Sequence, residues 1–130
     1  MKASPMVWAG RVLTGLFALF MLGASIAPKF MGMPIAAQTL VDLGWSPEWV
    51  LPIGLMEFGF LVLYLYPRTS VLGAVMMTSL LGGAMATQVR VDSPLFSHQL
   101  FSLYLGLIMW GGLWLRDERL RSLFPFRRAP

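Results

Sequence analysis

The sequence predicts an all-α, polytopic membrane protein: an antiparallel bundle of four transmembrane helices, with a short interfacial helix between helices one and two. Two observations support this fold class. Of the 130 residues, 57% are hydrophobic and only 12% are charged, whereas soluble domains carry about 25% charged residues. Four apolar stretches also follow one another along the chain, and none has the polar face that a helix on a soluble protein needs. The length predicts a single domain over residues 1–130.

The four apolar stretches predict where each helix lies. A spanning helix needs about 20 apolar residues, and about 17 suffice, so these stretches are near the lower limit. We expect a basic tail over residues 116–130 and helices over residues 7–28, 49–66, 70–89 and 98–115.

The first stretch has a second interpretation, as a cleaved signal peptide. Ser25-Ile26-Ala27 resembles the small-residue cleavage site of such peptides. Pro28 directly after that site argues against cleavage, and three remaining helices would leave the two chain ends on opposite sides. We therefore expect this stretch to be the first helix.

The basic residues predict the orientation of the bundle. Lys29 and Arg90 fall on one side of a four-helix arrangement. The opposite side, where both ends and the middle loop meet, holds Lys2, Arg11, Arg68, Arg116, Arg119, Arg121, Arg127 and Arg128. Because basic residues concentrate on the cytoplasmic side, we expect an inner-membrane protein with both ends in the cytoplasm. Membrane topology then explains the basic charge, so we expect no nucleic-acid partner.

The connections and the residue types refine this picture. Pro34 begins a predicted interfacial helix that ends before Gly44, and a tight turn at Pro67 joins helices two and three. Cysteine is absent and histidine occurs once, so we expect no disulfide and no metal site.

Helix three carries small residues at a spacing of four. Such a stripe lets another backbone approach closely in a bilayer, where packing rather than the hydrophobic effect holds helices together. Its contact is either within the bundle or with a membrane-protein partner, including a second copy of the chain. The stripe comprises Ala74, Thr78, Gly82 and Ala86.

Glu57 is the principal candidate for chemistry. It lies eight residues into the second apolar stretch, about 12 Å below the outer boundary at about 1.5 Å per residue. An ionisable group at that depth normally faces the bundle interior and marks a functional site. Desolvation favours its uncharged form, which suits a catalytic acid or base; the alternative is a protonated carboxyl that only joins two helices.

Polar residues at the outer helix ends are candidate ligand-binding partners of Glu57. Lys29 ends helix one and either reaches inward or extends to the headgroups, the commoner behaviour of such a lysine. Gln88 and Arg90 end helix three, and His98 begins helix four. Because these ends meet at one membrane face, we expect a polar pocket in the outer half of the bundle.

Several short segments in order resemble the DoxX-like family of small four-helix membrane proteins. They are GASIAPKF (23–30), GLMEFG (54–59), YPRTSVLGA (66–74), GGAMATQVRV (82–91), PLFSH (94–98) and GLWLRDERLRSLFP (112–125). The resemblance implies a four-helix membrane fold, similar to that of quinone-linked proteins such as vitamin K epoxide reductase. Family members often carry His where this chain has Gln88, which argues against a proton relay through that position. The lack of cysteine excludes a dithiol mechanism.

These observations lead to three functional hypotheses. The first is an accessory or binding subunit that holds a lipophilic small molecule, with a quinone as one candidate, in a membrane redox or detoxification system. The second is a membrane-embedded isomerase or epoxide-processing enzyme that uses Glu57 as acid or base. The third is a purely structural partner subunit. The sequence leaves open whether the protein is an enzyme.

Overall fold

A computed structural model describes residues 4–128, which are helical with no strand in this range. Lys2 lies outside the described residues. Short 3₁₀ turns at Pro47–Trp49 and Pro67–Thr69 precede α4 and α5, and a π-helical turn at Leu95–Gln99 precedes α6. The helices are α1 (Pro5–Phe20), continued by a π-helical turn (Met21–Ile26) and α2 (Ala27–Phe30), then α3 (Pro34–Asp42), α4 (Val50–Leu65), α5 (Ser70–Arg90), α6 (Phe101–Arg116) and α7 (Glu118–Leu123).

Within residues 4–128, three helical segments are long and apolar enough to cross a membrane: Pro5–Phe30, Pro47–Leu65 and Pro67–Arg90. The predicted fourth crossing is different, because the helix is interrupted at Leu100 and α6 has 16 residues. Sixteen residues span about 24 Å, less than the ~30 Å of a typical hydrocarbon core. A four-crossing bundle therefore stays a prediction, whereas three membrane-length apolar helices are found.

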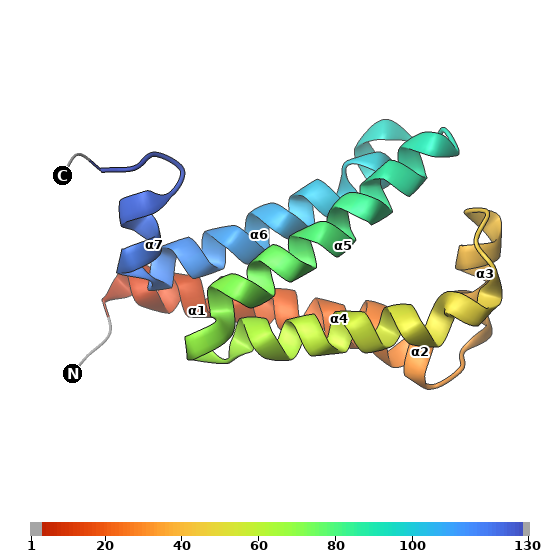
Figure 1. Cartoon of the computed structure of the whole chain (residues 1–130), viewed down its shortest axis with the longest axis horizontal. Helices are drawn as coiled ribbons and strands as arrows, with labels where there is room; N and C mark the ends of the chain where they lie inside the picture. The colour runs from red at the N-terminus through yellow and green to blue at the C-terminus, as the bar shows by residue number, and fades with distance from the viewer. Residues whose placement is uncertain (1–3, 129–130) are drawn as a thin grey trace.

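The helices form two arms that meet at one end and diverge toward the other (Figure 1). The α1–α2 segment and α4 lie in one arm, and α5 and α6 lie in the second. The start of α1, the α4–α5 turn and α7 share the closed end, whereas α3 lies at the open end. This places the basic residues Arg11, Arg68 and Arg119 at the closed end, the shared side that the sequence predicts.

Close approach of backbones seals the closed end. A Cβ atom on Gly10 would lie 2.6 Å from the Gly112 carbonyl oxygen, and one on Gly112 would lie 2.7 Å from the Thr14 hydroxyl. A Cβ on Gly73 would collide with the backbone of Tyr64. Glycine at these positions lets α1 contact α6 and α4 contact α5 directly. The packing of α1 against α6 makes the first apolar stretch part of the bundle core.

A buried polar network lies beside these contacts. The Tyr64 hydroxyl, on a side chain with no exposed surface, donates to the Met109 carbonyl at 2.5 Å and lies 3.2 Å from the Thr14 hydroxyl. Arg116 donates from Nε to the same threonine at 3.0 Å, with its guanidinium 5.3 Å from the Tyr64 ring centre. These bonds join α1, α4 and α6 at the end where the arms meet.

The small-residue stripe on α5 packs only in part. Ala74 is fully buried, and the Thr78 hydroxyl accepts a hydrogen bond from Trp110 at 2.8 Å. Gly82, in contrast, is exposed, and a Cβ atom there would meet nothing within 4 Å in the described chain. The outer half of the stripe is therefore without a partner helix at Gly82 in the part of the chain that the structure describes.

The structure adds one helix to those predicted. The basic tail folds into α7, whose first N–H groups are capped by the Asp117 carboxylate at 3.0 and 3.4 Å. Aspartate is a strong N-cap, so Asp117 followed by Glu118 was the available signal. The predicted helix between the first two spans is found as α3, and Gly44 follows it with a φ of +87°, as a helix-ending glycine does.

Candidate ligand-binding cavity

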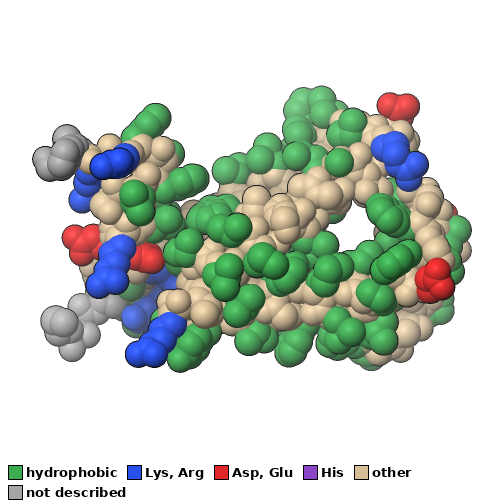
Figure 2. Space-filling model, in the orientation of Figure 1, with side chains coloured by type: hydrophobic (Ala, Val, Ile, Leu, Met, Phe, Trp, Pro, Cys, Tyr) green, Lys and Arg blue, Asp and Glu red, His purple; other side chains and the backbone are tan. Residues whose placement is uncertain are grey.

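The divergence of the two arms leaves a cavity of about 660 Å³ at the open end of the molecule. Its walls come from the α1–α2 segment, α3, α4, α5 and α6, and most of the lining side chains are apolar. In the space-filling view, an opening passes between the arms near α3 (Figure 2). The volume is within the range of about 300–1,000 Å³ that small-molecule sites occupy.

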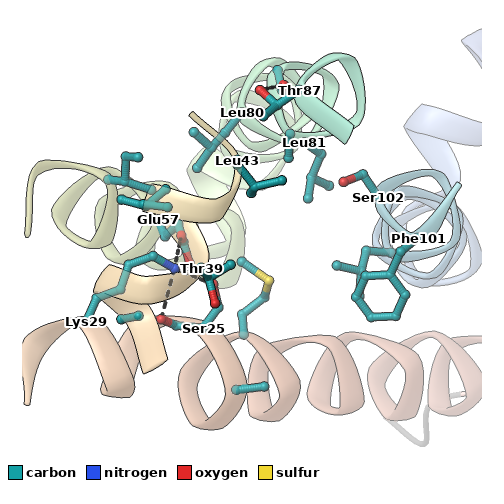
Figure 3. A pocket seen from close by; sticks show the side chains of 18 of the residues that line it. Ser25, Lys29, Thr39, Leu43, Glu57, Leu80, Leu81, Thr87, Phe101 and Ser102 are labelled. Atoms are coloured by element: carbon teal, nitrogen blue, oxygen red, sulfur yellow. Dashed lines mark hydrogen bonds and ion pairs between the residues drawn. The ribbon is translucent and has the colours of Figure 1, made fainter. Parts of the chain in front are cut away.

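One wall carries a compact cluster of three polar side chains, Ser25, Lys29 and Glu57 (Figure 3). The Lys29 ammonium lies 2.7 Å from Glu57 Oε1, and the Ser25 hydroxyl donates to Glu57 Oε2 at 2.5 Å. Lys29 also donates to the Ser25 hydroxyl at 2.8 Å and to the Ser25 carbonyl at 3.1 Å. The three side chains therefore form a closed ring of hydrogen bonds between the first segment and α4.

The π-helical turn in the first segment holds Ser25. In this turn the Ala27 N–H bonds to the Leu22 carbonyl, five residues earlier. Pro28 lacks an N–H and so interrupts the regular helical bonding at the same point. Ser25 and Lys29, four residues apart, lie on one helix face, and both are directed at Glu57. Such π-helical turns often occur at functional sites.

Lys29 and Glu57 are both largely buried, so each charge needs the other as its counterion. The Glu57 side chain is 6% exposed and that of Lys29 is 14% exposed. Removing a charge from water is costly, and an opposite charge at short distance offsets the cost. Lys29 thus reaches inward to the carboxylate rather than out to the headgroups.

Two other predicted site residues border the same cavity from the second arm. Gln88 accepts a hydrogen bond from the Ser93 hydroxyl at 2.5 Å, and His98 Nδ1 lies 2.7 Å from the Ser97 hydroxyl. Among residues 4–128, no hydrogen bond joins either side chain to the Glu57 cluster. The predicted pocket residues therefore face one cavity from two walls, with open space between the walls.

Most of the chain matches the model of one protein family. The model of the DoxX-like family matches residues 12–112, which is more than three quarters of the chain and includes Lys29, Glu57, Gln88 and His98. The chain belongs to the DoxX-like family. No curated protein and no solved structure matches this DoxX-like chain significantly. The family and the apolar helices together make it a membrane protein.

Arg90 of this DoxX-like protein lies away from the cavity lining. Its guanidinium donates to the Leu43 carbonyl at 2.8 Å, and a Cβ atom on Gly44 would lie 2.7 Å from the same guanidinium. The contact ties the end of α5 to the chain that follows α3. The predicted role of Arg90 in ligand binding stays a prediction, because its guanidinium is not among the groups that line the cavity in this structure.

Sequence reasoning missed the hydroxyl-bearing residues of the cavity lining, which are Ser25, Thr39, Ser79, Thr87 and Ser102. Ser25 was detectable, because it precedes Lys29 by four residues on the same predicted helix. Ser102 and Thr87 had no such signal. Their position depends on how α5 and α6 diverge from the first arm, which no local pattern encodes.

Proposed function

We propose that this DoxX-like protein binds a lipophilic small molecule in the space between its two arms. One observation carries the proposal: an apolar cavity of about 660 Å³ has a buried ion pair, Lys29 with Glu57, on its wall. Binding sites for small molecules typically combine an apolar enclosure with a few converging polar groups. The apolar walls suit a hydrocarbon body, and the Ser25–Lys29–Glu57 cluster suits a polar head.

The opening between the arms supports entry from the side. Many side chains around it are hydrophobic (Figure 2), and the cavity lining includes Trp45, Ile53 and Leu80. In a bilayer such an opening faces lipid tails, so a molecule dissolved in the membrane reaches the cavity without crossing water. The polar head then moves toward Glu57 while any long tail stays among the lipids.

The proposal includes the arrangement in the membrane. The turn at Leu95–Gln99 and α6 together complete a fourth crossing beside α5, and the basic closed end faces the cytoplasm of an inner membrane. The protein then serves as an accessory or binding subunit of a membrane redox or detoxification system. A quinone is one candidate ligand.

A second candidate function is acid–base catalysis on a bound lipophile, such as isomerisation or epoxide processing. The contact that favours it is the 2.5 Å hydrogen bond between Ser25 and the Glu57 carboxylate at the cavity wall. A carboxylate at the cavity wall can accept a proton from one position of a substrate and return it at another, as isomerisation requires. Turnover that survives Glu57→Gln would exclude this mechanism.

The small molecules that co-purify with the protein test the proposed binding function. Wild type, Glu57→Gln and the control Glu48→Gln are purified in mild detergent, and co-purifying molecules are identified by native mass spectrometry and redox difference spectra. Glu48 is a matched control because its carboxyl is exposed in the turn before α4. A further variant, Ala84→Phe, fills the cavity from α5 without changing charge.

The proposal predicts a lipophilic molecule in wild type and Glu48→Gln, with much less in the other two variants. A ligand retained equally by Ala84→Phe and Glu57→Gln would mean that it binds elsewhere. If no lipophile is found in wild type, and none is taken up when a quinone or its quinol is added, the binding function is wrong.

A further inference from the structure

We infer that the cavity selects neutral ligands that donate a hydrogen bond, such as an alcohol, a phenol or a quinol, over carbonyl compounds and ethers of the same shape. The inference rests on the proposed binding function and adds the chemistry of the ligand head. It follows from the hydrogen bonds that the Ser25–Lys29–Glu57 cluster already makes, and from the acceptors that these bonds leave free.

Lys29 has no donor left to offer. An ammonium group carries three N–H donors and no acceptor. In this structure Lys29 has three acceptors within hydrogen-bond distance: Glu57 Oε1 at 2.7 Å, the Ser25 hydroxyl at 2.8 Å and the Ser25 carbonyl at 3.1 Å. A ligand carbonyl could bind Lys29 only by displacing one of these acceptors, so the most obvious donor for a quinone oxygen is occupied.

Glu57 keeps acceptor capacity. A carboxylate offers about four lone-pair positions, and the described residues use one on each oxygen, for Lys29 and Ser25. The hydroxyl proton of Ser25 is itself committed to Glu57. The cluster therefore presents oxygen lone pairs to the cavity and no free proton.

Two threonines on other walls of the cavity also have only hydrogen-bond acceptors free. Thr39 donates its hydroxyl proton to the Ile35 carbonyl at 2.7 Å, and Thr87 donates to the Gly83 carbonyl at 2.9 Å. Both side chains border the cavity (Figure 3), so each offers only lone pairs there. Donors without an acceptor among residues 4–128 remain on the Ser102 hydroxyl, the Gln88 amide and the indoles of Trp45 and Trp49. None of these groups is hydrogen-bonded to the Glu57 cluster, and Ser102 and Gln88 lie in the opposite arm from it.

The charge of the cluster also favours a neutral ligand. The ammonium of Lys29 and the carboxylate of Glu57 sum to zero, so the cavity wall has no net charge to attract an ion. Transfer of a charged head into apolar surroundings would remain costly. A neutral hydroxyl compound, which donates one hydrogen bond to Glu57, satisfies both conditions.

The test compares two probes that differ only in the donor: a para-alkylphenol with a brominated alkyl chain, and its methyl ether. Bromine quenches tryptophan fluorescence, and Trp45 and Trp49 border the cavity, so quenching in detergent micelles reports binding. The proteins are wild type, the exposed-carboxyl control Glu48→Gln, and a double variant, Lys29→Met with Glu57→Gln. The double variant leaves no unpaired charge, which favours folding, and circular dichroism checks its helicity.

We expect wild type and Glu48→Gln to bind the phenol about tenfold or more tightly than the ether, the effect of one hydrogen bond to a charged acceptor. The double variant should bind both probes with nearly equal affinity, because the amide that replaces the carboxylate has N–H groups that can donate to the ether. Equal binding of the two probes by wild type would overturn the donor selectivity and leave the binding function standing. Binding of neither probe by wild type would count against the binding function itself.

Discussion

The Lys29 ammonium lies 2.7 Å from the Glu57 carboxylate, although α3 and its two connecting loops separate these residues along the chain. Each group is buried at the wall of an apolar cavity, and each supplies the countercharge that the other needs. The pair also joins the first helical segment to α4 at the level where the two arms have separated. The stability of this region and the proposed ligand recognition therefore involve the same two side chains.

Removal of one member of this pair should cost more than removal of both. Lys29→Met leaves an unpaired carboxylate, and we expect a loss of about 3 kcal/mol or more in unfolding free energy. The double variant, Lys29→Met with Glu57→Gln, should recover part of that loss. A double-mutant cycle from unfolding in detergent measures the coupling. Additive losses would show that the two charges act independently.

The Tyr64 hydroxyl should contribute measurably to the closed end of the bundle. Tyr64→Phe leaves the Met109 carbonyl and the Thr14 hydroxyl without their buried partner, and we expect a loss of about 1–3 kcal/mol. Thermal unfolding in detergent measures the change. Tyr66→Phe is the control, because Tyr66 is 56% exposed and its loss should have little effect. Equal melting temperatures for Tyr64→Phe and wild type would contradict the network.

Alanine substitutions at two glycines of α5 should change the stability of the protein in different directions. Gly73→Ala places a Cβ atom against the Tyr64 backbone, whereas Gly82→Ala places one in open space. We expect Gly73→Ala to destabilise the protein by more than about 1 kcal/mol through overpacking. Gly82→Ala should be neutral or stabilising by up to about 1 kcal/mol, because alanine favours helix. Thermal unfolding of both variants provides the comparison, and a strong loss at Gly82 would place another helix on that face.

Arg90 should restrain α3 rather than bind the ligand. Arg90→Ala removes the hydrogen bond to the Leu43 carbonyl, so amide hydrogen exchange over residues 34–44 should become faster. Exchange in α4 and the affinity for a bound lipophile should change little. Arg68→Ala, at the opposite end of the bundle, is the control. Unchanged exchange in α3, together with weaker binding, would instead assign Arg90 to the ligand site.

The sequence by itself determined the helical class, the family and the approximate extent of the second and third predicted helices. These features follow from local rules: apolar runs, prolines at helix starts and a glycine after α3. The helix predicted over 49–66 is found at Val50–Leu65, and the one over 70–89 at Ser70–Arg90. Glu57 was identifiable because an acidic residue in an apolar helix needs an explanation wherever the helix packs.

Only the tertiary structure decided which residues meet. Contact of Gly10 with Gly112 and of Gly73 with Tyr64 closes one end. The arms diverge toward the other end (Figure 1), and Gly82 of the α5 stripe is left exposed. The choice of Lys29 between the headgroups and Glu57 depends on the π-helical turn and on the distance between two helices. Local sequence patterns carry no information on these distances, because they arise from the balance of packing over the whole bundle.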